Sequence, residues 1–190
     1  MIDIPCIIFA GGKSSRMGED KALLPFGGFS TITEFQLNKL QKIFNNVYIS
    51  CKNKNKFTFD AHFIEDIESD GIYAPTIGFV SSFNYLDSQR IFVISVDTPF
   101  INSKEIEKIV DADNNSLDAT VASLKGKMQP LCGLYHSSLK ENFLDMLKTN
   151  NHKLGLLLKD VRTLYIDFND EQKFLNLNDP SQYKKALTLI

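Results

Sequence analysis

The segment from Ile4 to Phe26 constrains the fold of this chain more than any other. It begins with the apolar run Ile7-Ile8-Phe9, which is too short for a helix and is soon followed by the glycine pair Gly11-Gly12. Such a run is typical of a buried strand in a parallel sheet. Because glycine lacks a Cβ, the backbone after the strand can bend sharply and approach a ligand closely. The segment therefore predicts an α/β fold that opens with a strand and a binding loop.

The loop after this first strand also carries three cations, Lys13, Arg16 and Lys21. Backbone N–H groups beside several cations suit a polyphosphate, which offers many acceptor oxygens and several negative charges. Two better-known phosphate loops are excluded by spacing. A P-loop requires a glycine where this chain has Ile7, and neither glycine of the pair starts a Gly-x-Gly-x-x-Gly fingerprint. The loop predicts a polyphosphate site of another kind.

Apolar patterns along the rest of the chain predict alternating helices and strands. Helices are expected over about 31–44, 79–86, 103–110, 138–148, 154–159 and from 181, and strands over 47–49, 62–64, 91–96, 118–124, 129–135 and 164–166. A strand, helix, strand start predicts a parallel sheet with right-handed crossovers. The hairpin 118–135 would add an antiparallel strand, and Pro130 indicates that this strand is at an edge or bulged. A single domain covering residues 1–190 is expected.

Two carboxylates follow predicted strands, Asp66 after 62–64 and Asp97 after 91–96. Pro99 cannot continue a strand ladder, so Asp97 is expected at the carboxyl end of a buried strand. Ligands of open α/β sheets bind at that edge, where the first loop also lies. Mg²⁺ is typically held there by one or two carboxylates and by phosphate oxygens, which makes Asp97 the predicted metal ligand. The competing interpretation is an aspartate that merely ends a strand.

These parts suit the attack of a phosphate oxygen on the α-phosphorus of a nucleoside triphosphate, with pyrophosphate leaving. Such chemistry needs positioning and charge neutralisation more than a protein nucleophile. Arg16 and Lys21 would neutralise the triphosphate, and Asp97 would hold Mg²⁺, with Mn²⁺ as an alternative. The histidines and cysteines form no persuasive nucleophilic arrangement along the sequence. Arg16, Lys21 and Asp97 are therefore the predicted catalytic residues.

The bulk properties narrow the classes of protein to consider. A net charge of −2 argues against a dedicated nucleic-acid binder. No apolar run reaches the length of a membrane span, and no signal peptide is recognisable. The three cysteines have no metal-binding or disulfide spacing and are expected to be small buried hydrophobes of a cytoplasmic protein.

The motif Ala10-Gly11-Gly12-x-Ser14-x-Arg16-Met17-Gly18-x-Asp20-Lys21-x-Leu23-Leu24 closely resembles the signature of the molybdenum cofactor guanylyltransferases (MobA-type). This resemblance implies a three-layer αβα, Rossmann-like nucleotide-diphospho-sugar transferase (glycosyltransferase-A-like) fold. It also implies transfer of GMP from GTP to molybdopterin. Transient contacts with cofactor-biosynthesis proteins or recipient enzymes would be expected of such a protein.

The resemblance extends over most of the chain and implies roles for individual residues. The Asp-x-Pro magnesium ligand of the family falls on Asp97, and its Gln-Pro-x-x-x-Leu-Tyr element corresponds to residues 129–135. A late Asn-x-Asn element falls on Asn176 and Asn178, in the vicinity of the metal and the acceptor. The implied nucleotide-binding residues are Phe9, Ala10, Gly11, Gly12, Arg16, Lys21, Ser50, Asp66 and Asp97.

Some positions depart from the family pattern, and alternatives stay open. Ser50 stands where asparagine is frequent, and Asp179 replaces a threonine and would add a carboxylate near the metal. A cytidylyltransferase for the same cofactor and a sugar-phosphate nucleotidyltransferase remain alternatives, although by resemblance Ala10-Gly11-Gly12 favours guanine. A non-catalytic nucleotide carrier or sensor is the alternative outside enzymes. The presence of both Lys21 and Asp97 argues against it.

Overall fold

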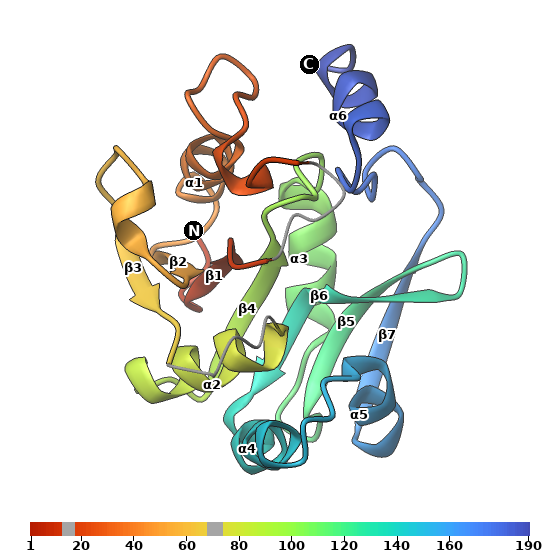
Figure 1. Ribbon diagram of the computed structural model, residues 1–190. Helices are drawn as coiled ribbons and strands as arrows, with labels where there is room; N and C mark the ends of the chain where they lie inside the picture. Colours follow the sequence, from red (N-terminus) through yellow and green to blue (C-terminus); the bar gives the residue numbers. More distant parts are fainter. Residues whose placement is uncertain (13–17, 68–73) are drawn as a thin grey trace.

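The first strand, β1, lies inside a seven-stranded sheet with the order β3-β2-β1-β4-β6-β5-β7 (Figure 1). The strands β3, β2, β1 and β4 are parallel, whereas β6 runs antiparallel to both of its neighbours. The strands are β1 (Cys6–Phe9), β2 (Val47–Cys51), β3 (His62–Glu65), β4 (Arg90–Ser95), β5 (Ala119–Leu124), β6 (Lys127–His136) and β7 (Thr163–Phe168). The structure is a computed structural model that describes residues 1–12, 18–67 and 74–190.

Every residue of β1 is buried, because the sheet is covered on both faces. Cys6 and Ile8 belong to one apolar core, and Ile7 and Phe9 belong to the other. Successive side chains of a strand point to opposite faces, which explains this alternation. Burial of a side chain of this size contributes roughly 1.5–3 kcal/mol. The short apolar run therefore fixes β1 in the middle of the sheet and the loop that follows at the sheet's carboxyl edge.

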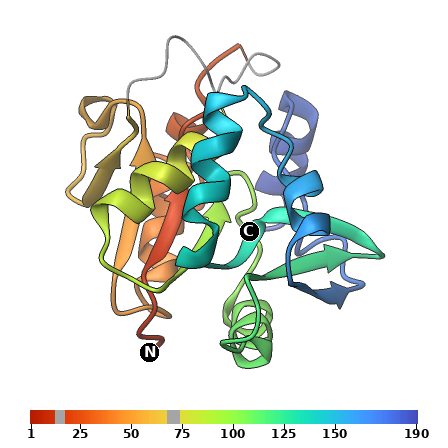
Figure 2. The same ribbon diagram turned by 90° about the horizontal axis from the view of Figure 1, so that it is seen from below.

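The helices form two separate layers. Buried residues of α1, α3 and α6 belong to the first core, and those of α2, α4 and α5 belong to the second. Figure 2 shows α3 (green) and α4 (cyan) on opposite sides of the sheet. The helices are α1 (Ile32–Leu40), α2 (Pro75–Tyr85), α3 (Ser103–Ala112), α4 (Lys140–Lys148), α5 (Leu154–Asp160) and α6 (Pro180–Leu187). The predicted three-layer αβα architecture, mostly parallel with an antiparallel strand, is confirmed.

The helix boundaries follow the capping chemistry more closely than the apolar pattern. α3 begins with a capping box in which Asn102 accepts a hydrogen bond from the first turn and Glu105 accepts one from the Asn102 backbone. α1 begins after the cap Thr31, close to the expected start, but it ends at Leu40 and not near 44. Phe44 is buried because it lies beside Ile2 in an isolated bridge. Its apolar character reflects this tertiary contact and not helical periodicity.

Pro130 lies in β6 between two other strands, so the expectation of an edge strand is wrong, whereas the alternative of a bulge is confirmed. The register between β5 and β6 jumps here, because Val121 pairs with Gly133 but Ala122 pairs with Gln129. Residues 130–132 therefore stand outside the ladder with β5, and proline's missing N–H costs no bond to that strand. The same residues line a cavity beside the end of β4.

The cysteines are free and buried, which agrees with their predicted role as small hydrophobes. Burial raises the pKa of the Cys51 thiol to about 12 and does the same for Cys132. These thiols are therefore poor nucleophiles near neutral pH. Within the described parts of the chain, no helix combines the length and the apolar character that crossing a membrane requires.

Gly133 of β6 leaves no room for a side chain. A Cβ at this position would lie 2.6 Å from the Thr120 carbonyl oxygen and 2.7 Å from Val121 Cα, both of which are backbone atoms. We expect Gly133→Ala to lower the free energy of unfolding in urea by about 1–3 kcal/mol, the usual cost of overpacking. Gly155→Ala in α5 is the matched control, since its Cβ would meet only the flexible thioether of Met128. Equal destabilisation of both variants would contradict this expectation.

Candidate active site

Lys21 and Asp97, which are far apart in the sequence, form an ion pair at the carboxyl edge of the sheet. Lys21 begins the short 3-10 helix η1 (Lys21–Leu23) after the first loop, and Asp97 follows β4. The Lys21 Nζ atom lies 2.6 Å from Asp97 Oδ2, and the two side chains are only 20% and 14% exposed. This contact therefore joins the end of the first loop to the Asp-x-Pro element.

Neighbouring groups hold Asp97 in one orientation. The Ser95 hydroxyl donates to Asp97 Oδ1 at 2.6 Å, so that both carboxylate oxygens are engaged. The Asp97 carbonyl accepts from the backbone N–H of Leu177 at 2.9 Å, which ties the C-terminal segment to the site. The next residue, Asn178, accepts from Lys21 Nζ through its side-chain oxygen at 3.2 Å.

The C-terminal segment contributes Asn176 and Asn178 in different ways. Asn178 contacts Lys21 directly, whereas Asn176 lines the cavity beside Asp97. Asp179 caps α6, since its carboxylate accepts from the Gln182 backbone N–H at 2.9 Å. The carboxylate at this position therefore serves as a helix cap, a role that threonine also fills.

The first loop is anchored on both sides of β1. The Phe9 carbonyl accepts from Val96 N at 3.1 Å, and Ala10 N donates to the Ser50 carbonyl at 2.9 Å. Gly11 and Gly12 are exposed and line a cavity together with Phe9 and Ala10. The backbone at Gly11 and Gly12 is therefore accessible to a ligand. Lys13 and Arg16, the other two predicted cations of the loop, lie outside the described residues.

Ser50 and Asp66 form a second polar pair beside the loop. The Ser50 hydroxyl donates to Asp66 Oδ1 at 2.8 Å, and a Cβ on Gly11 would lie 3.0 Å from Asp66 Oδ2. A side chain at Gly11 would require the Asp66 carboxylate to move by a few tenths of an ångström. Burial raises the pKa of Asp66 above its ordinary value, and the Ser50 hydrogen bond and two lysines oppose the shift.

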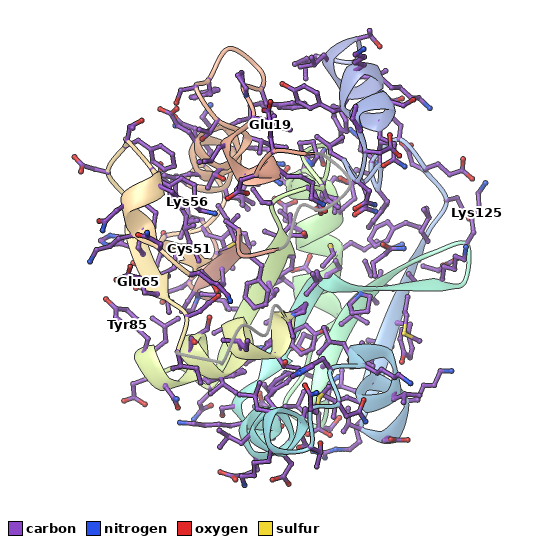
Figure 3. The ribbon with its side chains drawn as sticks, viewed as in Figure 1. Glu19, Cys51, Lys56, Glu65, Tyr85 and Lys125 are labelled. Carbon is purple, nitrogen blue, oxygen red and sulfur yellow. The ribbon has the colours of Figure 1, made fainter. Side chains whose placement is uncertain are left out.

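Lys56 is a site residue that the sequence did not reveal, because its segment has the composition of a solvated loop. It ends the short 3-10 helix η2 (Lys54–Lys56), and its side chain reaches back to the end of β1 (Figure 3). Its Nζ donates to the Ala10 carbonyl at 3.2 Å and to Asp20 Oδ2 at 2.7 Å. Lys56 therefore joins the two ends of the first loop. Composition alone carries no signal for such a contact.

Two cavities of similar size flank Asp97. The loop cavity has a volume of about 190 Å³ and the hairpin cavity about 200 Å³. The loop cavity is lined by Phe9, Ala10, Gly11, Gly12, Asp20, Lys21, Ala22, Pro75, Ser95, Val96, Asp97 and Leu131. The hairpin cavity is lined by Ser95, Asp97, Thr98, Ile101, Gln129, Pro130, Leu131, Cys132, Phe174 and Asn176. Because both share Asp97, two substrates could meet at its carboxylate.

A family model described as "MobA-like NTP transferase domain" matches residues 6–163. This chain belongs to that family. A molybdenum cofactor guanylyltransferase of Campylobacter jejuni (strain RM1221) is 37% identical over 183 residues, which are 96% of this chain and 95% of that protein. One of Helicobacter pylori (strain ATCC 700392 / 26695) is 33% identical over 193 residues, which cover 99% and 94%.

A solved structure shows the same fold. Molybdopterin-guanine dinucleotide biosynthesis protein A from Archaeoglobus fulgidus superposes with a TM-score of 0.83 at 18% identity, over 98% of both chains. The predicted nucleotidyltransferase fold is thereby confirmed.

In this MobA-like domain, Asp97 and Asn178 offer oxygen atoms to a divalent cation. The Lys21 ammonium already lies between them and donates to an oxygen of each. Oxygen donors suit Mg²⁺. Within the described residues, no three His, Cys, Asp or Glu side chains gather into a metal site. The donor set therefore fits an ion held by one carboxylate and by substrate phosphates, and it does not form an all-protein cage.

Removal of the Ser50 hydroxyl should shift the titration of Asp66. Ser50→Ala deletes a hydrogen bond to the charged carboxylate, so we expect the pKa of Asp66 to rise further. A folded-state pKa above the unfolded value gives stability that is present below the unfolded pKa and lost as the pH rises through the folded pKa. The variant should therefore lose more stability than the wild type as the pH rises from about 4.

Carbon-13 NMR of the Asp66 carboxyl and urea unfolding between about pH 4 and 7 measure these two effects. Ser116→Ala, which changes an exposed serine far from Asp66 in the sequence, is the control. An unchanged Asp66 titration in the Ser50→Ala variant would show that the hydroxyl does not stabilise the carboxylate.

Proposed function

We propose that this protein transfers GMP from GTP to the terminal phosphate of molybdopterin, giving the guanine dinucleotide form of the cofactor and pyrophosphate. The Lys21–Asp97 pair carries this proposal, because Lys21 lines the loop cavity and Asp97 lines both the loop cavity and the hairpin cavity. The proteins that are 33–37% identical over nearly the full length bear the name of this activity. A cytoplasmic location rests on the cysteine pattern and on the lack of a recognisable signal peptide or membrane span in the sequence. Transient contacts with proteins that deliver or receive the cofactor rest on the family resemblance alone.

The loop cavity is the proposed site of GTP. Backbone N–H groups after β1, together with Arg16 and Lys21, would bind the triphosphate. Ser50 and Asp66 lie beside the same loop and are the proposed contacts of the nucleoside. Asp97 would hold Mg²⁺, or alternatively Mn²⁺, with Asn178 close by. When bound, the ion supplies positive charge to the phosphate oxygens during the transfer.

In the reaction, an oxygen of the acceptor phosphate attacks the α-phosphorus of GTP. A new P–O bond forms, the bond to the bridging oxygen of the β-phosphate breaks, and pyrophosphate leaves with the electron pair. Lys21 changes partner when GTP binds: its ammonium leaves Asp97 for the triphosphate, and the carboxylate becomes available as a ligand. The protein thus contributes orientation and charge, which suffice for phosphoryl-type transfer.

The hairpin cavity is the proposed acceptor site. Its wall combines apolar side chains with the amides of Gln129 and Asn176, a composition that suits a flat heterocycle with polar edges. Since Asp97 and Ser95 line both cavities, the acceptor phosphate would approach the α-phosphorus from this side.

Loss of the Asp97 carboxylate should abolish most of the activity. We expect Asp97→Ala to lower turnover by about two to three orders of magnitude, the scale found when one preorganised electrostatic group is removed. Pyrophosphate release with GTP, Mg²⁺ and molybdopterin measures this. Asp111→Ala, which removes an exposed carboxylate of α3, is the control. Undiminished turnover of the Asp97→Ala variant would reject Asp97 as the proposed ligand.

The choice of base separates the proposed reaction from its alternatives. We expect pyrophosphate release in the presence of molybdopterin with GTP and at least tenfold less with CTP, roughly the effect of 1.4 kcal/mol. Calorimetric titrations with GTP, CTP and ATP, with and without Mg²⁺, provide the matching affinities. Preference for CTP would favour a cytidylyltransferase. Tight GTP binding without turnover would favour a nucleotide carrier.

A further inference from the structure

One face of α1 carries three polar side chains, Thr33, Gln36 and Lys39, at intervals of three residues. Side chains at this spacing are neighbours on a helix surface. Thr33 and Gln36 are fully buried, and Lys39 is half-buried. Each donates to backbone carbonyl groups outside α1. We call these three residues the polar stripe of α1.

Gln36 contacts the segment that carries Asp97. Its Nε2 atom donates to the Thr98 carbonyl at 3.1 Å and lies 3.4 Å and 3.5 Å from the carbonyl oxygens of Ser95 and Val96. The Gln36 Oε1 atom is buried and has no hydrogen-bond partner among the described residues. A buried amide oxygen without a partner costs about 1–3 kcal/mol. The side chain is therefore unfavourable for stability at one end, while its other end fixes the turn around Asp97.

Lys39 extends the same contact further along this segment. Its Nζ donates to the carbonyl groups of Pro99 and Ile101, both at 2.7 Å. Burial lowers the pKa of Lys39 to about 7, so the two carbonyl oxygens only partly replace the water that the ammonium has lost. A lysine in such a place is a poor stabiliser of the core.

Thr33 contacts the segment that carries Lys21, the ion-pair partner of Asp97. Its hydroxyl donates to the Ala22 carbonyl at 2.6 Å. Ala22 lies in η1 directly after Lys21 and is itself buried. α1 therefore holds the backbone beside Lys21 through Thr33 and the backbone around Asp97 through Gln36 and Lys39.

We propose that Thr33, Gln36 and Lys39 are positioning residues that set the separation of Lys21 and Asp97 and hence the geometry of the metal-bound triphosphate. The inference rests on the proposed function, because it assigns these residues to the same reaction. Mg²⁺ demands nearly ideal octahedral geometry, so a small displacement of a single carboxylate ligand weakens its binding. None of the three side chains needs to touch a substrate.

The first test compares Gln36→Met and Lys39→Met with matched controls on or just beyond the same helix. Asn38→Met and Lys42→Met change exposed side chains of the same kinds. We expect the two stripe variants to lower kcat about 10- to 100-fold, the usual effect of removing a group that orients a metal ligand. We also expect a similar increase in the Mg²⁺ concentration for half-maximal activity, and unchanged controls.

The second measurement does not depend on turnover. Electron paramagnetic resonance of Mn²⁺ in the presence of GTP reports the affinity of the ion for the protein–nucleotide complex. We expect about 10- to 100-fold weaker Mn²⁺ binding in Gln36→Met than in Asn38→Met. We also expect the thermal stability of Lys39→Met to equal or exceed that of the wild type. Wild-type Mn²⁺ affinity in a folded Gln36→Met variant would overturn the inference.

A double-mutant cycle separates positioning from general stability and from failure of the proposed function. If Gln36 acts through Asp97, Gln36→Met has little further effect on turnover in an Asp97→Asn background. An equal loss in both backgrounds would show a merely structural role. Full activity of Asp97→Asn alone would instead reject the proposed function. A loss in Asp97→Asn with no loss in Gln36→Met would reject only the inference.

Discussion

The ion pair between Lys21 and Asp97 joins two halves of the site that are 76 positions apart in the sequence. Both side chains are mostly buried, so each charge depends on the other for the stabilisation that water no longer supplies. Removal of one partner would leave a buried charge uncompensated. The pair also places a cation among the oxygen atoms of Asp97 and Asn178. Lys21 therefore helps to hold the Asp97 carboxylate in place.

The topology of the sheet makes this contact possible. β1 pairs directly with β4, and parallel strands present their carboxyl ends at the same edge. The glycine loop and Asp97 are thus adjacent as soon as the two strands pair, and the N–H of Val96 bonds to the Phe9 carbonyl across the gap. The antiparallel strand β6 then brings its bulge to the same edge. The loop cavity and the hairpin cavity therefore lie at the same edge of one sheet.

The sequence predicted those parts of the site that depend on the strands. A short apolar run before two glycines, and another before Asp97, are local signals that survive in the structure. Contacts made by side chains from distant elements left no such signal. Lys56 has the composition of a solvated loop, yet it binds the Ala10 carbonyl, and Pro130 lies inside the sheet because a bulge removes it from the ladder. The polar residues of α1 likewise interrupt an apolar pattern, and the sequence does not indicate which groups accept their hydrogen bonds.

In the polar stripe of α1, polar residues stand at positions where packing against the core would favour apolar residues. Ile32, Leu37 and Leu40 fill the core from neighbouring positions, so apolar residues in the stripe would extend that packing. Instead, Gln36 leaves one oxygen without a partner among the described residues, and Lys39 carries a desolvated ammonium. Functional sites are where such local costs are expected, because geometry there matters more than stability. The carbonyl groups that accept hydrogen bonds from the polar stripe belong to the two segments that carry Lys21 and Asp97. The side chains that lower stability therefore lie beside the proposed active site.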